Sequence, residues 1–219
     1  MRETIIRIND DGIAVEECKN GITTFKSITP DSLLECINQS ILRGRVTSGL
    51  LPRNCLSFAG GDNGECDVVI MHPEIRADIS YYETEYKNFP FMRCVFGFHV
   101  SKDGRISGCR VGVIADERPR PTTPMFIYPF GNVNGFHLCI GSNTLPPAKS
   151  FHTMESLTYH LLSMPHNNHN FLTRNNKLGL EQRALIEFLK DKPPEVYYLD
   201  VLVPCASTLS DFIAGKCMQ

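Results

Sequence analysis

Three apolar segments separated by turn-forming residues constrain the fold of this chain most. Cys94 to Val100 is followed by a Lys-Asp-Gly turn, Arg105 to Ile114 by a proline-rich connection, and Met125 to Tyr128 completes the set. Apolar runs of this length between turn formers are typical of strands joined in sequence order. The sequence therefore predicts an antiparallel meander sheet in this part of the chain.

Helical spacing follows the predicted meander. The segment from Ser150 to Ser163 has apolar residues three or four positions apart and precedes Pro165, so it predicts a helix with one buried face. A second helix is predicted from Leu180 to Lys190, before two prolines, and Val196 to Val203 is predicted to be a further strand. Strands and helices in this order indicate the α+β class.

The N-terminal part predicts a hairpin followed by a helix. Thr4 to Ile8 and Ile13 to Val15 flank an Asn-Asp-Asp-Gly turn, and Ile22 to Phe25 follows Asn20-Gly21. Thr29 and Pro30 have the order of an N-cap and a first helical residue, and the helix is expected to continue through Ile37.

The stretch from Arg43 to Asp67 is rich in loop-forming residues and gives no chemical signal. We therefore expect residues 1–85 to form an N-terminal extension of hairpin, helix and loop, packed on a main domain of residues 86–219. At 219 residues and 42% apolar content, the chain is long enough to bury one substantial core.

Charge and terminal sequence restrict the partners. The formal net charge is -2, and the charged residues are scattered, so we expect neither a nucleic-acid partner nor an anionic membrane surface. The N-terminus lacks the apolar region of a signal peptide, and no run of about 18 apolar residues occurs. These features predict a cytoplasmic protein, and leave its oligomeric state open.

The nine cysteines are odd in number, irregularly spaced and never arranged as Cys-x-x-Cys. This pattern argues against a disulfide framework and against a zinc ribbon, so most of them are expected to be reduced thiols packed as small apolar groups. Cys94 and Cys109, in predicted strands, are expected to belong to the core.

Cys139 has different surroundings. Between Pro129 and Gly135 the sequence is Pro-Phe-Gly-Asn-Val-Asn-Gly, and an extended segment from Phe136 to Ile140 follows. Cys139 should therefore lie just beyond a surface loop that contains Asn132. Since side chains alternate along a strand, His137 and Cys139 should point to the same face.

An acyl-carrying cysteine needs room for a partner, a thiolate that can attack, and a hydrogen-bond donor for the oxyanion. The amide of Asn132 is a candidate for that donor, and the imidazole of His137 is a candidate for activating the thiol. These residues alone leave a second interpretation open, and it is the commoner one: Cys139 as a buried strand cysteine that serves only packing.

The order of motifs around Cys139 resembles the catalytic half of the ubiquitin-conjugating enzymes. Those enzymes have His-Pro-Asn before the active cysteine, then a helix and a Leu-Leu-Ser-x-Pro-Asn turn. This chain has Tyr-Pro-Phe-Gly-Asn ending at Asn132, then Cys139, and Leu-Leu-Ser-Met-Pro-His-Asn from Leu161 to Asn167. Over residues 90–190 it is similar to the prokaryotic ubiquitin-conjugating-enzyme-like family, which includes PRTRC-system protein B and the conjugating enzymes of bacterial ubiquitination-like operons.

The resemblance implies a ubiquitin-conjugating-enzyme-like fold, in which a meander sheet is flanked by helices and residues 86–219 form the catalytic domain. It also implies that Cys139 accepts a ubiquitin-like modifier from an activating enzyme as a thioester and transfers it to an amine of a target protein. No cofactor is expected, because the activating enzyme of such pathways uses the ATP. Tyr128 stands where the family has histidine, and the spacing from Asn132 to Cys139 is one residue shorter than in the eukaryotic enzymes.

Two alternatives stay open at this point. The chain could be a catalytically inactive binding module that keeps the conjugating fold to dock the modifier or the activating enzyme. In addition, His160, His166 and His169 contain a His-x-x-His spacing that can supply two metal ligands, but no cysteine or acidic partner lies at a typical spacing, and a polar turn is the simpler interpretation. Under the resemblance, His166 or His169 folds back toward Cys139 and polarises the incoming amine.

Overall fold

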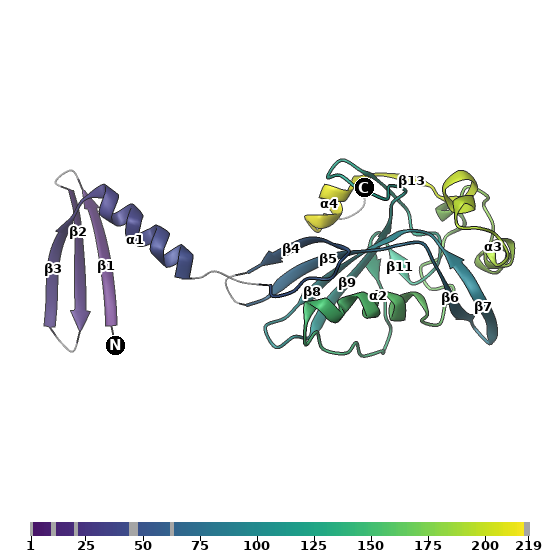
Figure 1. Cartoon of the computed structure of the whole chain (residues 1–219), viewed down its shortest axis with the longest axis horizontal. Helices are drawn as coiled ribbons and strands as arrows, with labels where there is room; N and C mark the ends of the chain where they lie inside the picture. Colours follow the sequence, from purple (N-terminus) through teal and green to yellow (C-terminus); the bar gives the residue numbers. More distant parts are fainter. Residues whose placement is uncertain (1, 10–11, 20–21, 44–47, 62–63, 217–219) are drawn as a thin grey trace. The chain divides into compact units, whose positions relative to one another are not determined.

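The computed structural model describes residues 2–9, 12–19, 22–43, 48–61 and 64–216. The chain divides into two compact units, Met1–Thr47 and Ser48–Gln219 (Figure 1). Residues 48–85, which the sequence analysis assigns to the N-terminal extension, belong to the larger unit. The reason is that this stretch supplies strands to the sheet of the larger unit.

The smaller unit is an antiparallel three-stranded sheet followed by a helix. The predicted strands and helix are confirmed, although residues 10–11 and 20–21 of the predicted turns lie outside the described residues. The Oγ1 atom of Thr29 accepts a hydrogen bond from the backbone N–H of Ser32 at 3.2 Å, which confirms the predicted N-cap. The elements are β1 (Arg2–Asn9), β2 (Gly12–Lys19), β3 (Ile22–Ile28) and α1 (Pro30–Arg43).

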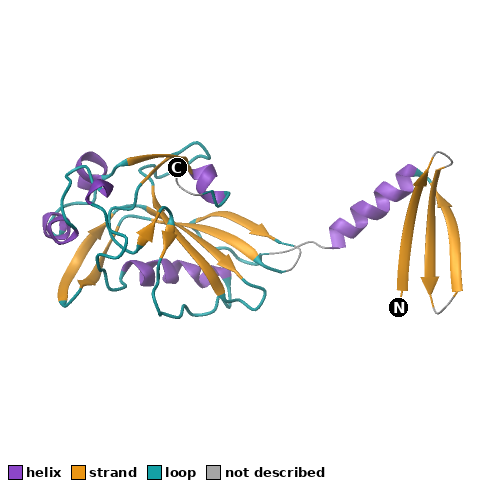
Figure 2. Cartoon of the chain, turned by 180° about the vertical axis from the view of Figure 1, so that it is seen from behind, coloured by secondary structure: helices purple, strands orange, loops and turns teal. Residues whose placement is uncertain are grey.

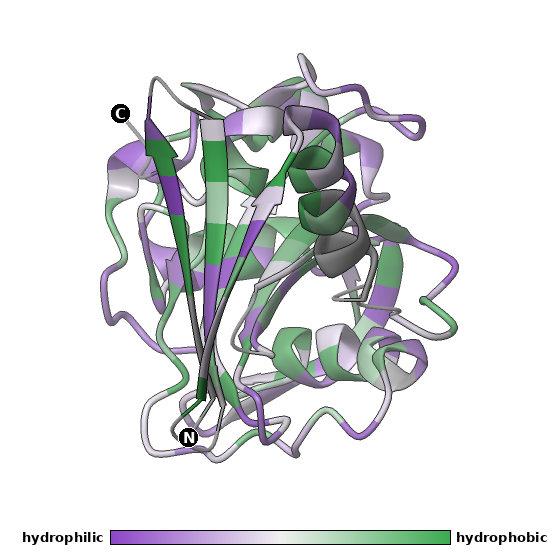
Figure 3. Cartoon of the chain, turned by 90° about the vertical axis from the view of Figure 1, so that its left-hand side faces the viewer, coloured by the Kyte–Doolittle hydropathy of each residue, from purple (hydrophilic) through white to green (hydrophobic). Residues whose placement is uncertain are grey.

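The smaller unit buries little apolar surface. Hydrophobic and hydrophilic residues mix along its strands (Figure 3), and Ile13 is the one buried hydrophobic side chain among its described residues. Ile8 is 70% exposed and Phe25 is 71% exposed.

The larger unit contains one main sheet, a separate hairpin and helices around them (Figure 2). Short 3-10 turns cover Phe151–Thr153 and Thr173–Asn175. The strands are β4 (Cys55–Gly60), β5 (Cys66–His72), β6 (Ile75–Tyr81), β7 (Thr84–Phe91), β8 (Cys94–Val100), β9 (Ile106–Val113), β10 (Pro124–Phe126), β11 (Val133–Asn134), β12 (His137–Leu138) and β13 (Pro204–Thr208), and the helices are α2 (Met154–Leu162), α3 (Gln182–Leu189) and α4 (Leu209–Ile213).

Strands β4, β5, β8 and β9 lie side by side, each antiparallel to the next. In the sequence, the β6–β7 hairpin comes between β5 and β8, and it forms a separate two-stranded sheet. Beyond β9 the sheet continues through β12 at one position and through β10 at another. The predicted α+β class and the antiparallel meander are therefore confirmed. Strand β10 ends at Phe126, two residues earlier than predicted.

Both faces of the main sheet are covered. The face that contains Val68, Phe96 and Val111 packs in the main core, to which α2 contributes Leu157 and Leu161. The opposite face packs a smaller cluster that includes residues of α4. Since β5 is covered on both sides, its continuous apolar run Val-Val-Ile has buried side chains pointing each way.

Two predictions for the larger unit are wrong. Val196 to Val203 is not a strand, because Tyr197–Val201 forms a π-helical turn and the strand comes afterwards, as β13. In the helical turn Tyr197 and Val201, four residues apart, are both buried, whereas Leu199 is 72% exposed; strand alternation would put all three on one face. The loop-rich stretch also contains β4, whose sequence Cys-Leu-Ser-Phe-Ala-Gly has only a short apolar alternation.

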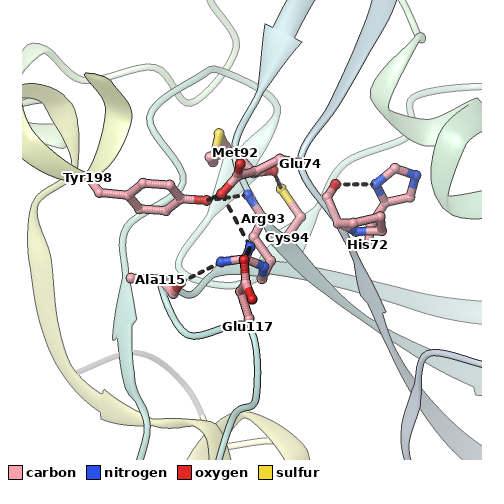
Figure 4. A network of polar contacts seen from close by, with 9 residues as sticks. His72, Glu74, Met92, Arg93, Cys94, Ala115, Glu117 and Tyr198 are labelled. Atoms are coloured by element: carbon pink, nitrogen blue, oxygen red, sulfur yellow. Dashed lines mark hydrogen bonds and ion pairs between the residues drawn. The ribbon is translucent and has the colours of Figure 1, made fainter. Parts of the chain in front are cut away.

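A polar network ties one end of the meander strands to the C-terminal segment (Figure 4). The guanidinium of Arg93, whose residue is 7% exposed, donates to the carbonyl oxygen of Ala115 and lies 3.3 Å from the carboxylate of Glu74. The hydroxyl of Tyr198 accepts from the backbone N–H of Arg93 at 2.9 Å and donates to Glu74 at 2.8 Å. The partners fix the position of the turn that follows Val196.

Candidate functional site

Cys139 lies directly after β12, at the end of the loop that the sequence analysis singled out. Strands β11 and β12 pair through Val133 with Leu138, so the loop closes on itself as a tight hairpin around Gly135, whose φ is +60°. The Cys139 side chain is half-buried, and its backbone N–H donates to the carbonyl oxygen of Asn132 at 2.7 Å. The hairpin therefore places Cys139 beside Asn132, as predicted.

Asn132 joins three segments of the chain. Its φ is +65°, a left-handed conformation that asparagine tolerates better than most residues. Its backbone N–H donates to the carbonyl oxygen of His169 at 2.5 Å, and its side-chain Nδ2 donates to the carbonyl oxygen of Pro165 at 3.4 Å. The backbone bonds of Asn132 thus hold the turn after α2 against the segment that carries Cys139.

The residue before Asn132 has no space for a side chain. A Cβ atom on Gly131 would lie 2.1 Å from the carbonyl oxygen of Asn167, so the close approach of the two backbones requires glycine. The Gly131 N–H donates to Oε1 of Gln182 at 2.9 Å, and Gln182 on α3 is fully buried. The hydrogen bond from Gly131 to Gln182 therefore anchors the loop to helix α3.

A hollow of about 390 Å³ lies between Cys139 and the turn after α2. We call it the Asn132 hollow; Asn132, Cys139 and His169 all line it, together with Asn143, Met164 and Asn167. Residues from the loop before Cys139 and from the turn after α2 thus line one cavity. The family resemblance named His166 or His169 as the histidine near Cys139, and left the choice open.

A second hollow of about 250 Å³ lies on the other side of the same segment. It is bounded by β9 on one wall and by residues 137–141 on the other, and we call it the β9 hollow. His137 and Cys139 both line it, in agreement with the predicted common face. The segment from Cys139 to Gly141 separates the two hollows and lines each of them.

His166 is placed differently from His169. Its imidazole is buried, packs against the rings of Phe91 and Phe130, and has Nε2 at 3.2 Å from the carbonyl oxygen of Leu162. Burial lowers the pKa of His166 to about 4, so the ring is neutral at pH 7. It lines neither hollow, and the structure brings His169, not His166, to the cavity that contains Cys139.

Cys94 and Cys109 differ from Cys139 in their burial. Cys94 and Cys109 are buried in the main core, as predicted, and burial raises the pKa of the Cys94 thiol and raises the pKa of the Cys109 thiol to about 12. A thiol held in this way has almost no thiolate at neutral pH. Cys109 lines only the β9 hollow and is buried, whereas Cys139 is half-buried and lines both hollows.

Metal ligands do not gather in the described part of the chain: no three His, Cys, Asp or Glu side chains there come close enough to hold an ion. The three histidines of the metal interpretation also differ in solvent exposure, because His166 is buried whereas His160 and His169 are exposed. The exposed and buried rings do not form one ligand set.

Two supporting residues were not predicted: Gly131, where the backbones approach too closely for a side chain, and Gln182, its hydrogen-bond partner. Gln182 lies 51 residues from Gly131 in the sequence, and only the packing of α3 brings them together. Tyr81 is a similar case, since its hydroxyl donates to Oδ1 of Asn168 at 2.7 Å from the distant β6–β7 hairpin.

Comparisons with known proteins give no match to a family model, a curated protein or a solved structure. Among the described residues, none of the helices has the length and apolar character needed to cross a membrane.

Proposed function

We propose that the larger unit is a conjugating enzyme of the ubiquitin-conjugating-enzyme-like kind, which carries a ubiquitin-like modifier as a thioester on Cys139. The modifier comes from an activating enzyme and passes to an amine of a target protein. One observation carries the proposal: Cys139 is half-buried at the rim of two hollows, next to Asn132. The meander of β4, β5, β8 and β9, with α2 following the cysteine segment, agrees with the fold that the sequence resemblance implies.

The first step is transthiolation. The Cys139 sulfur attacks the thioester carbonyl of the loaded activating enzyme, a bond to Cys139 forms, and the bond to the departing sulfur breaks. The proton of the Cys139 thiol ends on the departing thiolate. In this proposal His137, which faces the β9 hollow with Cys139, assists the loss of that proton.

The second step is aminolysis. The amine of the target attacks the carbonyl, a C–N bond forms, the C–S bond to Cys139 breaks, and the amine proton is returned to the sulfur. The Asn132 side chain supports the oxyanion formed in each step. Its present hydrogen bond to Pro165 is long at 3.4 Å and therefore weak, so redirecting the amide costs little. His169, in the same hollow, polarises the amine.

Thiol trapping tests the proposal. The protein is incubated with the activating enzyme, its ubiquitin-like modifier and ATP, and is then run on a gel with and without reductant. We expect an adduct that thiol reductants remove. Cys139→Ser should convert it to a reductant-stable oxyester or abolish it, because a serine ester is not cleaved by thiols.

Cys36→Ser is the matched control, since Cys36 is an exposed cysteine in the smaller unit. It should leave the adduct unchanged. If the adduct persists in Cys139→Ser with the same sensitivity to reductant, the thioester is elsewhere and the proposal fails. Noncovalent capture of the modifier without any adduct would instead support the binding module.

A further inference from the structure

Strand β9 has a paired edge and a largely open edge. On one side it pairs with β8 from Ile106 to Val113. On the other side, the strand pairings of the described residues are limited to Arg110 with His137 and Val113 with Phe126. The backbone N–H of Val111 also donates to the carbonyl oxygen of Phe136 at 2.8 Å, and Cys109 is only 4% exposed. Among the described residues, the segment from Ile106 to Gly108 therefore has β8 on one side and no strand on the other.

The open edge faces Cys139. Among the described residues, β12 pairs with β9 only through His137 and ends at Leu138, so the chain from Cys139 onward is not paired with β9. The β9 hollow fills the gap, with Ile106 to Cys109 on one wall and Leu138 to Gly141 on the other. The gap ends where the backbone N–H of Ala148 donates to the carbonyl oxygen of Gly104 at 2.8 Å. It is thus a slot along the strand edge that leads to the thiol.

We infer that this slot binds the extended carboxyl-terminal tail of the modifier as an added strand on β9, with the reacting carbonyl at Cys139. The inference rests on the proposed function, and it names the tail by its chemistry: an extended peptide, held mainly through its backbone. A strand edge offers N–H and C=O groups that such a peptide completes.

The lining of the slot fits a peptide backbone. Ser107, Gly108 and Gly141 have small or no side chains, so another chain can approach β9 closely. Ile106 and Leu145 supply an apolar surface at the same place. Because side chains alternate along a strand, every second residue of the tail contacts this surface, and the tail should be apolar at alternate positions.

Backbone methylation of a peptide tests the inference on the intact, unmodified protein. The probe is the pentapeptide Thr-Val-Thr-Val-Ala, made as a thioester of 2-mercaptoethanesulfonate. Cys139 attacks its carbonyl, the bond to the sulfonate thiol breaks, and that thiol leaves with the proton. The rate of acylation is followed by intact mass spectrometry, and the acylated cysteine is identified after proteolysis.

Each peptide nitrogen is then methylated in turn, which removes one N–H and adds bulk at that position. In an added strand, alternate N–H groups point to β9. We expect methylation at these alternate positions to lower the second-order rate constant for Cys139 by about tenfold, and methylation at the intervening positions to change it less than about twofold. The intervening peptides are the matched controls.

Two other results are informative. If Cys139 is acylated faster than Cys36 but methylation has no alternating effect, the added strand is excluded while the thioester function stands. If the peptide acylates Cys139 no faster than the exposed Cys36, neither the slot nor the cysteine is adapted to accept a tail, and the inference fails together with its basis.

Discussion

The two units of the chain differ in how they use apolar residues. The larger unit buries aromatic side chains from many elements, among them Phe89, Phe91 and Phe130, each at most 1% exposed. The smaller unit has a regular sheet, yet Ile13 is its one buried hydrophobic residue among those described. Regular hydrogen bonding is thus present in both, but apolar burial, the main favourable contribution to folding, is concentrated in one.

This difference teaches that strand formation and stability are separate properties. A short antiparallel sheet needs a covered apolar face to be stable in water. The candidate site lies in the unit with the core, where Phe130 stands two residues before Asn132 and contacts several aromatic rings. The site is therefore held by a rigid interior and not by the loop alone.

Separating the units should give the largest effect. A chain of residues 48–219 is expected to unfold cooperatively, whereas residues 1–47 alone should lack a cooperative transition, because so little of that unit is buried. Circular dichroism with chemical denaturation measures both. A cooperative transition in the isolated 1–47 chain would contradict the comparison.

Truncating one aromatic residue in each unit sharpens the contrast. Phe130→Ala should lower the free energy of unfolding by about 4 kcal/mol, since it leaves a cavity among the packed rings. Phe25→Ala, at a side chain that is 71% exposed, should change it by less than about 0.5 kcal/mol. Denaturant titration of the whole chain tests both, and similar losses from the two variants would show that Phe25 is buried in solution.

Arginine residues allow the same comparison for charge. Arg93→Ala removes the centre of the network in Figure 4 and leaves Glu74 without its cation, so a loss of about 3 kcal/mol is expected. Arg7→Ala breaks an exposed ion pair with Glu16 in the smaller unit and should cost about 0.5 kcal/mol or less. Thermal or chemical unfolding measures both changes. A larger loss of stability for Arg7→Ala than for Arg93→Ala would contradict the expectation that the buried network contributes more than the exposed ion pair.

The smallest expected effect concerns pH. His166 has a pKa of about 4 in the folded chain, against about 6.5 when unfolded, so the unfolded state binds the extra proton between these values. The contribution of His166 to the free energy of unfolding is therefore fully present above about pH 6.5 and is lost as the pH falls toward 4. The expected loss is about 2 kcal/mol between pH 7.5 and pH 5.

His166→Phe should reduce this dependence on pH in denaturation measured at several pH values. His160→Gln, at an exposed position of α2, should not. A residual slope is expected from His72, whose pKa is also lowered by burial. An unchanged slope in His166→Phe would mean that His166 is not buried as a neutral ring.

The sequence predicted those elements whose pattern is local. Strand β8 begins and ends where the apolar run does, and the helix after Cys139 has the expected buried face. The Thr29 cap is confirmed because an N-cap depends on neighbours within one turn. By contrast, β4 was missed, since its short alternation becomes a strand only through pairing with β5.

For the site, the sequence by itself determined that Cys139 would follow a tight loop with Asn132 nearby, because turn residues encode that geometry locally. Tertiary structure decided which histidine lies at the hollow beside Cys139: aromatic packing buries His166, while the backbone bond from Asn132 holds the turn of His169 at the hollow. The open edge of β9 is likewise a tertiary feature. Whether a strand edge is free depends on where the neighbouring segments separate from it, and the residue types of the strand itself do not determine those positions.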